Sequence, residues 1–361
     1  MMRYFLTAIL IAFSNLVFTQ QATAPLNIRL TDSVSCTTVK DQSNSPTCWV
    51  FGTNSLFESD LIKRKNIRLN LSEMFIARYA YIDKANQFLA TNGKTYFEGG
   101  GQFHDVIRVV NRYGILPEEL YSGMPGEQSY HNHAGLDTAM KIFTNRLLIE
   151  GKKLVEGNDL HQMNDTLDKY LGKVPVDFYY QEKRYTPKTF AEEVVGFGND
   201  YLELVSFADQ PLYKQFILSD KYNWANDSFY NVTLDDMHQL VDSALHKGWS
   251  VGWEGDVTET GFQHTGGYAS FPDSAHQYDE ERLANYKNES TERDHMLQIA
   301  GIGNDKNGKK WYYLKNSWGT FFSKFDGYLY MEENYFRLKT VILFVNKQAL
   351  PQILKNKLGL N

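Results

Sequence analysis

The sequence predicts an α+β protein, because helical and strand-like patterns occupy different parts of the chain. Before Gly248, apolar residues recur at helical spacing, as in the stretch from Phe103 to Val110. After Gly248, short runs rich in β-branched and aromatic residues are separated by turns such as Asn307-Gly308. Helices first and strands last differ from the βαβ alternation that builds a parallel sheet. Two subdomains of these kinds would place a cleft between them.

The helical elements have recognisable starts and stops. The first predicted helix runs from Cys48 to about residue 64, and a second follows Ser72. A third, over 103–113, is closed by Gly114, and a fourth begins at Thr233 and ends before Gly248. Between about 120 and 232 we expect helical segments separated by polar loops.

Five runs in the last third read as strands, because each is short and ends at turn residues. They are Val251 to Trp253, Met296 to Gly303, Trp311 to Leu314, Tyr328 to Met331 and Val341 to Val345.

The N-terminus predicts export. Arg3 precedes a mostly apolar run from Phe5 to Phe18, which is shorter than the ~20 residues of a membrane span and suits a signal peptide. We expect cleavage between about Thr19 and Ala24, a secreted or periplasmic protein and no stable membrane anchor. An uncleaved anchor or a buried helix is the alternative.

Composition excludes several classes of protein. A net charge of −6 gives no electrostatic reason to bind nucleic acid. Two cysteines, Cys36 and Cys48, exclude a disulfide framework, although one bridge between them stays open and would inactivate a nucleophile. His131-x-His133 lies in a polar stretch without an obvious third ligand, so we predict neither a metal nor a cofactor.

The strongest chemical signal surrounds Cys48. A cysteine at a helix N-terminus faces unpaired backbone amides, which favour its thiolate. Gln42 lies six residues upstream, and its amide could form an oxyanion hole with the backbone N–H of Cys48. The alternative is a buried structural cysteine beside a solvated glutamine.

A second group of polar residues belongs to the strand-rich region. His295 precedes one predicted strand, and Asn316 follows the next. Antiparallel pairing across the turn near Gly308 would bring them together, so that the amide orients the imidazole towards a thiol. Trp318 could shield that hydrogen bond from water.

These residues resemble those of papain-like cysteine peptidases, in Gln-x5-Cys-Trp, His before an apolar strand, and Asn-Ser-Trp-Gly. Within that superfamily the chain is most similar to the bleomycin hydrolase/aminopeptidase C branch. The likeness includes Leu71-Ser72-Glu73, Gly99 to Gln102, and Val251 to Val257. His295 lies 247 residues after Cys48, against roughly 130–150 in papain-type enzymes, which indicates about a hundred inserted residues.

The resemblance implies a papain-like fold of two subdomains. Its expected parts are a signal peptide (1–20), a helical subdomain with the nucleophile (21–120), a helical insertion (121–232), a β-barrel-like subdomain with His295 and Asn316 (233–346), and a tail (347–361). It also implies hydrolysis of peptides or proteins by Cys48, His295, Asn316 and Gln42. Gly99, Gly100, Gly101 and Trp318 would bind substrate, and inserts of this kind favour a homo-oligomer.

Specificity is left between two alternatives. In the resembling branch a C-terminal arm enters the cleft and makes the enzymes aminopeptidases, whereas only Asn346 to Asn361 follow the last predicted strand here. We therefore expect an aminopeptidase first and an endopeptidase second. Transglutaminase-like acyl transfer is disfavoured because Asn316 stands where those folds use Asp. A catalytically dead binding module would have lost one of the four residues. Ser317 is interpreted as a bystander.

Overall fold

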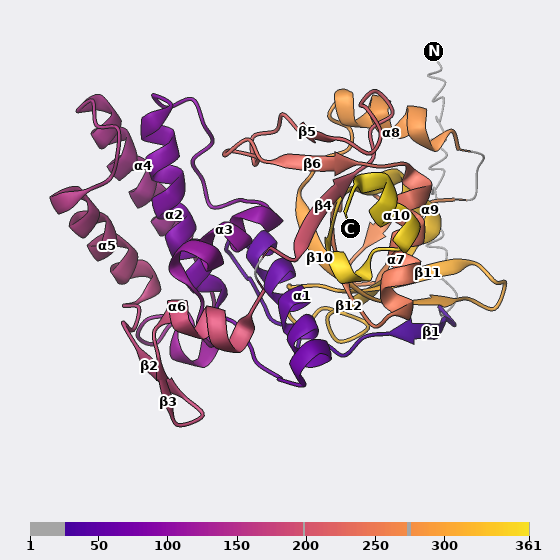
Figure 1. Cartoon of the computed structure of the whole chain (residues 1–361), viewed down its shortest axis with the longest axis horizontal. Coiled ribbons are helices and arrows are strands. Elements are labelled where there is room, and N and C mark those ends of the chain that lie inside the picture. The colour runs from indigo at the N-terminus through magenta and orange to yellow at the C-terminus, as the bar shows by residue number, and fades with distance from the viewer. Residues whose placement is uncertain (1–25, 198, 273–275, 361) are drawn as a thin grey trace, which may run out of the picture.

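The computed structural model describes residues 26–197, 199–272 and 276–360, and Figure 1 shows a helical half beside a sheet-rich half. The predicted leader lies outside the described residues. None of the described helices is long and apolar enough to cross a membrane.

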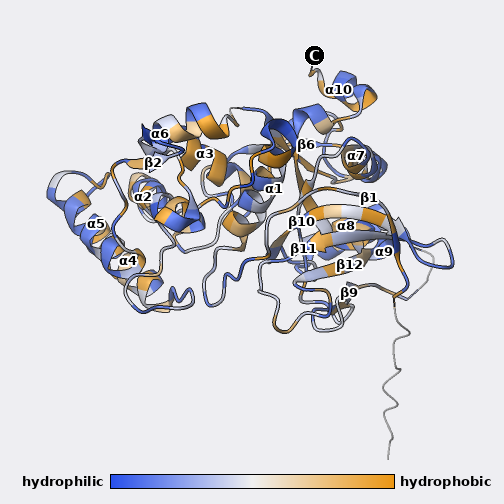
Figure 2. Ribbon diagram, turned by 90° about the horizontal axis from the view of Figure 1, so that it is seen from below, coloured by the Kyte–Doolittle hydropathy of each residue, from blue (hydrophilic) through white to orange (hydrophobic). Residues whose placement is uncertain are grey.

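The helical half is formed by the chain from Cys48 to about residue 197, whereas the earlier strand β1 (Arg29–Ser33) belongs to the sheet. Its helices are α1 (Cys48–Lys65), α2 (Glu73–Ala90), α3 (Phe103–Tyr113), α4 (Ala134–Ile149), α5 (Gly157–Leu171) and α6 (Pro187–Phe190), with short helical turns at Glu118–Leu120 and Ala191–Val195. A separate hairpin joins β2 (Phe178–Tyr180) and β3 (Lys183–Tyr185). In Figure 2, α4 and α5 lie at the end of this half farthest from the sheet.

Helix α1 lies between the two halves, where it packs on α2, α3 and the sheet. Its residues from Trp49 to Leu61 are all buried, including polar ones, as expected for a helix surrounded by protein. It ends at Asn66, whose left-handed φ of 54° closes the helix after three basic residues that suit a helix C-terminus. The predicted helix at Cys48 is confirmed.

Among the described residues, eleven strands form one sheet. They are β1 (Arg29–Ser33), β4 (Tyr201–Val205), β5 (Gln215–Ile217), β6 (Ser228–Asn231), β7 (Val251–Gly255), β8 (Phe262–Gln263), β9 (Tyr268–Ala269), β10 (His295–Asn304), β11 (Lys310–Lys315), β12 (Tyr328–Glu332) and β13 (Thr340–Asn346). Their order is β5-β6-β4-β13-β7-β10-β11-β12-β9-β8, and β1 pairs with β10. Every strand predicted after Gly248 is therefore confirmed.

Four helices accompany the sheet: α7 (Leu234–His246), α8 (Tyr278–Lys287), α9 (Glu333–Lys339) and α10 (Gln352–Leu358). The side chain of Thr233 accepts a hydrogen bond from the Asp236 amide at 3.0 Å, so α7 begins at the predicted cap. One buried apolar cluster joins the helical half to the adjacent sheet face, and a second fills the sheet-rich half beneath α7 and α10.

The expectation that residues 121–232 are helical is wrong for their last part. Strand β4 pairs antiparallel with β13, and β6 pairs parallel with β4, so this part extends the main sheet. The five-residue apolar run from Tyr201 is too short to separate a strand from a buried helix by periodicity. The available edge of β13, far along the chain, decides its structure.

The segment after β13 packs on α7. Lys247 donates to the carbonyls of Ala349 and Leu350, at 3.3 and 3.0 Å, and Lys357 contacts Asp236 at 2.9 Å. Leu354 and Leu358 of α10 are buried in the sheet-rich half. The described end of the chain is thus fixed against a helix of the sheet-rich half.

Candidate active site

Cys48 is the first residue of α1, as its place in the sequence predicts. The preceding loop is tightly bonded, since the Ser45 hydroxyl contacts both the Gln42 carbonyl and the Thr47 hydroxyl at 2.6 Å. Thr47 makes no side-chain cap, so backbone amides of the first turn remain beside the sulfur. The loop and helix together fix the thiol at the helix N-terminus.

The sheet brings His295 to the same place. His295 begins β10, and α1 packs directly on this strand. Gly52 permits the close approach, because a Cβ there would lie 3.2 Å from Cβ of Met296. The backbone amide of Met296 lowers the pKa of the Cys48 thiol, so the sulfur lies near the residue that follows His295.

Asn316 orients the imidazole. Strands β10 and β11 pair antiparallel, with Gln298 opposite Lys315, and Nε2 of His295 lies 2.8 Å from Oδ1 of Asn316. This bond assigns the Nε2 proton to the amide contact and leaves Nδ1 unprotonated. The Trp318 ring stacks on the imidazole, with centroids 4.4 Å apart. The predicted grouping of His295, Asn316 and Trp318 is therefore present.

Gln42 is held beside this group. Its Oε1 accepts from the Ser317 hydroxyl at 2.7 Å, and its Nε2 donates to the Ser45 carbonyl at 3.0 Å. The Gln42 backbone amide also donates to the Ser317 carbonyl at 2.8 Å. Ser317, interpreted from sequence as a bystander, instead fixes the side chain and the backbone of Gln42.

Burial disfavours the charged form of the Cys48 thiol and of the His295 imidazole when each group is considered alone. It raises the pKa of the Cys48 thiol to about 12, against the backbone amides of Met296 and Trp49, which lower it. Burial lowers the pKa of His295 to about 4, while the Asn316 bond raises it. A thiolate and an imidazolium would each offset the other's loss of solvation, so charge is favoured only when both form together.

The glycine segment, Gly99 to Gly101, makes close contacts with neighbouring side chains. The carbonyl of Gly99 accepts from Nε1 of Trp49 at 2.9 Å, and Lys84 donates to the Gly100 carbonyl. A Cβ on Gly100 would lie 2.7 Å from the ring of Tyr222, and one on Gly101 would lie 2.9 Å from Trp49. Glycine is needed here for close approach, and Tyr222 covers the middle residue.

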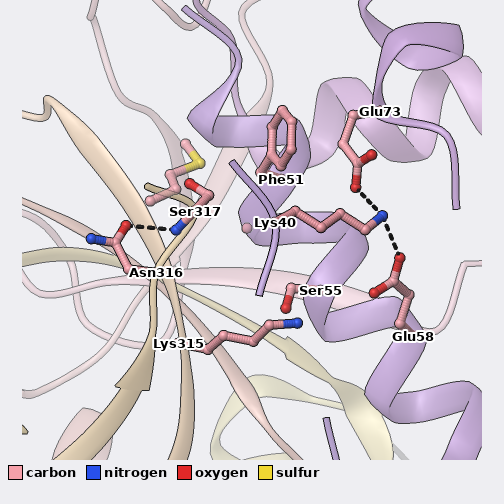
Figure 3. A pocket seen from close by; sticks show the side chains of 10 residues that line it. Lys40, Phe51, Ser55, Glu58, Glu73, Lys315, Asn316 and Ser317 are labelled. Carbon is pink, nitrogen blue, oxygen red and sulfur yellow. Dashed lines mark hydrogen bonds and ion pairs between the residues drawn. The ribbon is translucent and has the colours of Figure 1, made fainter. Parts of the chain in front are cut away.

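A buried charge cluster lies behind the site and was missed from sequence (Figure 3). Lys40 contacts Glu58 at 3.0 Å, Glu73 at 2.7 Å and Glu118 at 3.0 Å. A small cavity beside it is also lined by residues that adjoin the site, namely Lys315, Asn316 and Ser317. Lys40 is two residues from Gln42, so this cluster anchors the start of the loop that leads to Cys48.

Other candidate residues have different surroundings. Cys36 and Cys48 are both free thiols, so no bridge joins them. His131 and His133 are buried with their ring centroids 6.3 Å apart. Within the described ranges, no three His, Cys, Asp or Glu side chains are grouped to hold a metal ion.

Three further residues near the thiol were not singled out from sequence. Glu254 and Asp294 both raise the pKa of Cys48, and a thiolate at Cys48 would raise the pKa of Tyr222. A charged residue inside the buried strand from Val251 to Gly255 was the available signal for Glu254. Nothing local in the sequence distinguishes Tyr222.

Comparisons with known proteins agree with this geometry. The chain is 24% identical over 364 residues to Aminopeptidase G of Lactobacillus delbrueckii subsp. lactis, covering 86% of this chain and 81% of the relative. It is 22% identical over 377 residues to the mitochondrial Cysteine proteinase 1 of Saccharomyces cerevisiae (strain JAY291), covering 90% and 78%. The crystal structure of PepW from Lactobacillus rhamnosis HN001 superposes with a TM-score of 0.72 at 18% identity, over 92% of this chain and 84% of that one.

The fold is therefore papain-like, with the candidate Cys, His and Asn at the junction of its two halves. The chain belongs to the Peptidase C1-like family, whose model matches residues 12–360. It is a cysteine peptidase, and its similarity to proteins named Aminopeptidase C and Aminopeptidase G confirms the expected branch.

Proposed function

We propose that this cysteine peptidase is an aminopeptidase that uses Cys48 as nucleophile, His295 as acid and base, and Asn316 to orient the imidazole. The observation that carries the proposal is His295, held at 2.8 Å by Asn316 and stacked on Trp318 at the N-terminal end of α1. Relatives named Aminopeptidase C and Aminopeptidase G support the choice of substrate. Peptides with a free α-amine are thus the proposed substrates.

The chemistry follows from the positions of these groups. Cys48 Sγ bonds to the peptide carbonyl carbon while the thiol proton passes to Nδ1 of His295. The C–N bond then breaks, and the leaving amine takes that proton from His295. Water adds to the thioester and gives a proton to His295, which returns it to the departing sulfur, so that the acid product is released.

Gln42 is proposed to stabilise the developing oxyanion together with the Cys48 backbone amide. One N–H of its side-chain amide bonds to the Ser45 carbonyl, and an amide carries two such donors. The second N–H is assigned to the substrate oxygen. Loss of one oxyanion donor typically costs ~2.7–4 kcal/mol of barrier.

The test replaces each cysteine separately. Cys48→Ala should abolish hydrolysis of a free-amine aminoacyl coumarin amide, whereas Cys36→Ala should retain it. Cys36 is the matched control because it is also a free thiol, and it contacts Gln298 of β10 and Ser59 of α1 rather than His295. Turnover by pure Cys48→Ala protein would refute the mechanism.

An endopeptidase is the second candidate, favoured by one observation. The described segment 347–360 packs on α7 of the sheet-rich half, as the contact between Lys357 and Asp236 shows. In the resembling aminopeptidases a C-terminal arm instead enters the cleft and restricts cleavage to the substrate's N-terminus. Equal cleavage of amino-blocked and free-amine peptides would select this candidate.

Export is a separate proposal that rests on the N-terminal sequence alone. The apolar run after Arg3 is proposed to direct secretion or transfer to the periplasm, followed by cleavage between about residues 19 and 24. N-terminal sequencing of the mature protein tests this, and retention of Met1 would contradict it. A homo-oligomer stays a prediction.

A further inference from the structure

The segment 218–227, which joins β5 to β6, reaches from the sheet-rich half towards the helical half (Figure 1). On the helical side, Nε1 of Trp224 donates to Asp105 at 2.9 Å. On the sheet side, Asp220 accepts from Nε of Arg293 at 3.2 Å. Asn223 stiffens the segment by donating to the carbonyls of Leu218 and Asp227 at 3.0 and 2.9 Å. The segment is therefore fixed to both halves.

Tyr222 brings this segment to the reactive thiol. Its ring packs against Gly100 and lies edge-on to Tyr96, with centroids 5.2 Å apart. It is also close enough to Cys48 that a thiolate there would raise the pKa of its hydroxyl. An extended peptide that ran along the glycine segment would meet this ring. The ring therefore limits how much substrate can precede the cleaved bond.

Glu254 lies on the same side of the site with an unsatisfied oxygen. Its side chain is 2% exposed, on β7 opposite Met296 of β10. Oε1 accepts from Gln102 at 3.3 Å and lies 3.9 Å from Arg293, but Oε2 has no hydrogen-bond partner among the described residues. A buried carboxylate oxygen without a partner is costly, which points to a cationic or hydrogen-bonding occupant.

We propose that segment 218–227 closes the cleft beyond the first substrate residue and that Glu254 binds the α-ammonium of that residue. This inference rests on the proposed aminopeptidase function and names the groups that would produce its specificity. The ammonium supplies three N–H donors, and Oε2 of Glu254 is the free acceptor near Cys48. Asp294, next to His295, is a second carboxylate that acts on Cys48. The recognition is non-covalent.

The surroundings of Glu254 also favour a cation. Burial raises the pKa of Glu254 to about 8, although Arg293 lowers it. An ammonium bound at Oε2 would restore the carboxylate by supplying the missing positive charge. Arg293 also pairs with Asp220, so its single positive charge is shared between two carboxylates.

The experiment compares leucine coumarin amide with its N-acetyl derivative in the full-length mature chain. Glu254→Gln should lower kcat/KM for the free amine about tenfold or more, mainly through KM, and leave the acetylated substrate unchanged. Asp83→Asn is the matched control, because Asp83 is also a buried carboxylate with one bonded and one unpartnered oxygen, but it lies in the helical half beside Arg112 and Tyr113. An unchanged preference in Glu254→Gln would overturn the role of Glu254.

Tyr222→Ala tests the closure independently. It should raise kcat/KM for an N-acetylated dipeptide coumarin amide at least about tenfold, since the ring over Gly100 is removed. No gain would overturn the closure. The rate of Cys48 alkylation by iodoacetamide reports whether each variant has kept its site.

A measurement on the wild-type protein covers the case in which Glu254→Gln does not fold. Leucine amide should protect Cys48 from iodoacetamide, whereas N-acetylleucine amide should not. Equal protection would overturn ammonium recognition. Wild-type protein that cleaves neither coumarin amide, or both equally, would refute the proposed aminopeptidase itself. A wild-type preference for the free amine that both variants retain would refute only the present inference.

Discussion

The hydroxyl of Ser317 donates to Oε1 of Gln42 at 2.7 Å, across 275 residues of sequence. The backbones of the same two residues are joined by a second bond of 2.8 Å. The loop that precedes Cys48 is thereby tied to the end of the strand hairpin that carries His295 and Asn316. The relative position of the proposed oxyanion donor and the imidazole depends on this contact.

Removal of the Ser317 hydroxyl should weaken catalysis without destroying it. We expect Ser317→Ala to lower kcat about three- to tenfold, because a neutral hydrogen bond contributes about 1 kcal/mol and Gln42 keeps its bond to Ser45. Gln42→Ala should lower kcat about 10²–10³-fold. Steady-state kinetics on a free-amine substrate measure both. A larger loss from the serine change than from the glutamine change would contradict the assigned order.

Loss of the amide beside the imidazole should lower kcat more than KM. Asn316→Ala removes the acceptor 2.8 Å from Nε2 of His295, and a reduction of about 10- to 100-fold in kcat is expected. Asn304→Ala is the control, since Asn304 is the exposed last residue of β10, the strand that begins at His295. Equal effects of the two changes would argue against an orienting role.

The two thiols should differ in reactivity because of their neighbours. Burial raises the pKa of both Cys36 and Cys48, but only Cys48 lies beside the strand end that carries His295. Iodoacetamide near neutral pH should therefore modify Cys48 much faster than Cys36, as peptide mapping by mass spectrometry would show. His295→Ala should remove most of that difference. If both thiols react equally slowly in the wild-type protein, His295 does not activate Cys48.

The buried charge cluster behind the site should contribute strongly to stability. Lys40→Met leaves Glu58 and Glu73 buried without their cation, and we expect a loss of about 3–5 kcal/mol in the free energy of unfolding. Lys141→Met removes an exposed pair with Glu98 and should change it by less than about 1 kcal/mol. Urea unfolding measures both. Similar small losses would show that the cluster is not needed for folding.

His104 should make stability fall as pH rises. Burial alone would lower its pKa, but Glu203 at 2.7 Å, with Asp105 and Asp227, raises it to about 9. Because the pKa of His104 is higher in the folded than in the unfolded protein, its protonation stabilises the folded state. This contribution is complete below about pH 6.5 and disappears as the pH approaches 9. His104→Gln should therefore lower the free energy of unfolding by at most about 3 kcal/mol near pH 6, and by little near pH 9. A pH-independent difference would contradict the assignment.

The positions of Cys48 and His295 can be predicted from the sequence, because local patterns of helix starts and strand hairpins place each of them. A helix start fixes Cys48, and two strands joined by a short turn bring Asn316 to His295. Tyr222 and Glu254 could not be placed in this way. Tyr222 reaches Gly100 through a connection whose path depends on contacts with both halves. Glu254 is recognisable only as a charge in a buried strand.

The same limit explains β4. Its five residues fit a strand or a buried helix equally well, and only pairing with β13 decides between them. Ser317 was misjudged for a related reason, since its partner Gln42 is distant in sequence. Local pattern thus predicts most of the elements, whereas long-range pairing decides the structure of β4 and the partner of Ser317.

The pairing of β4 with β13 also bears on protein engineering. Excision of residues 121–232, in search of a minimal enzyme the size of papain, would remove β4 and leave β13 as a bare edge. That edge carries seven buried residues in a row, from Thr340 to Asn346, and an uncovered apolar edge strand invites aggregation. A shortened enzyme would have to keep Tyr201 to Asn231, or supply a new strand in its place.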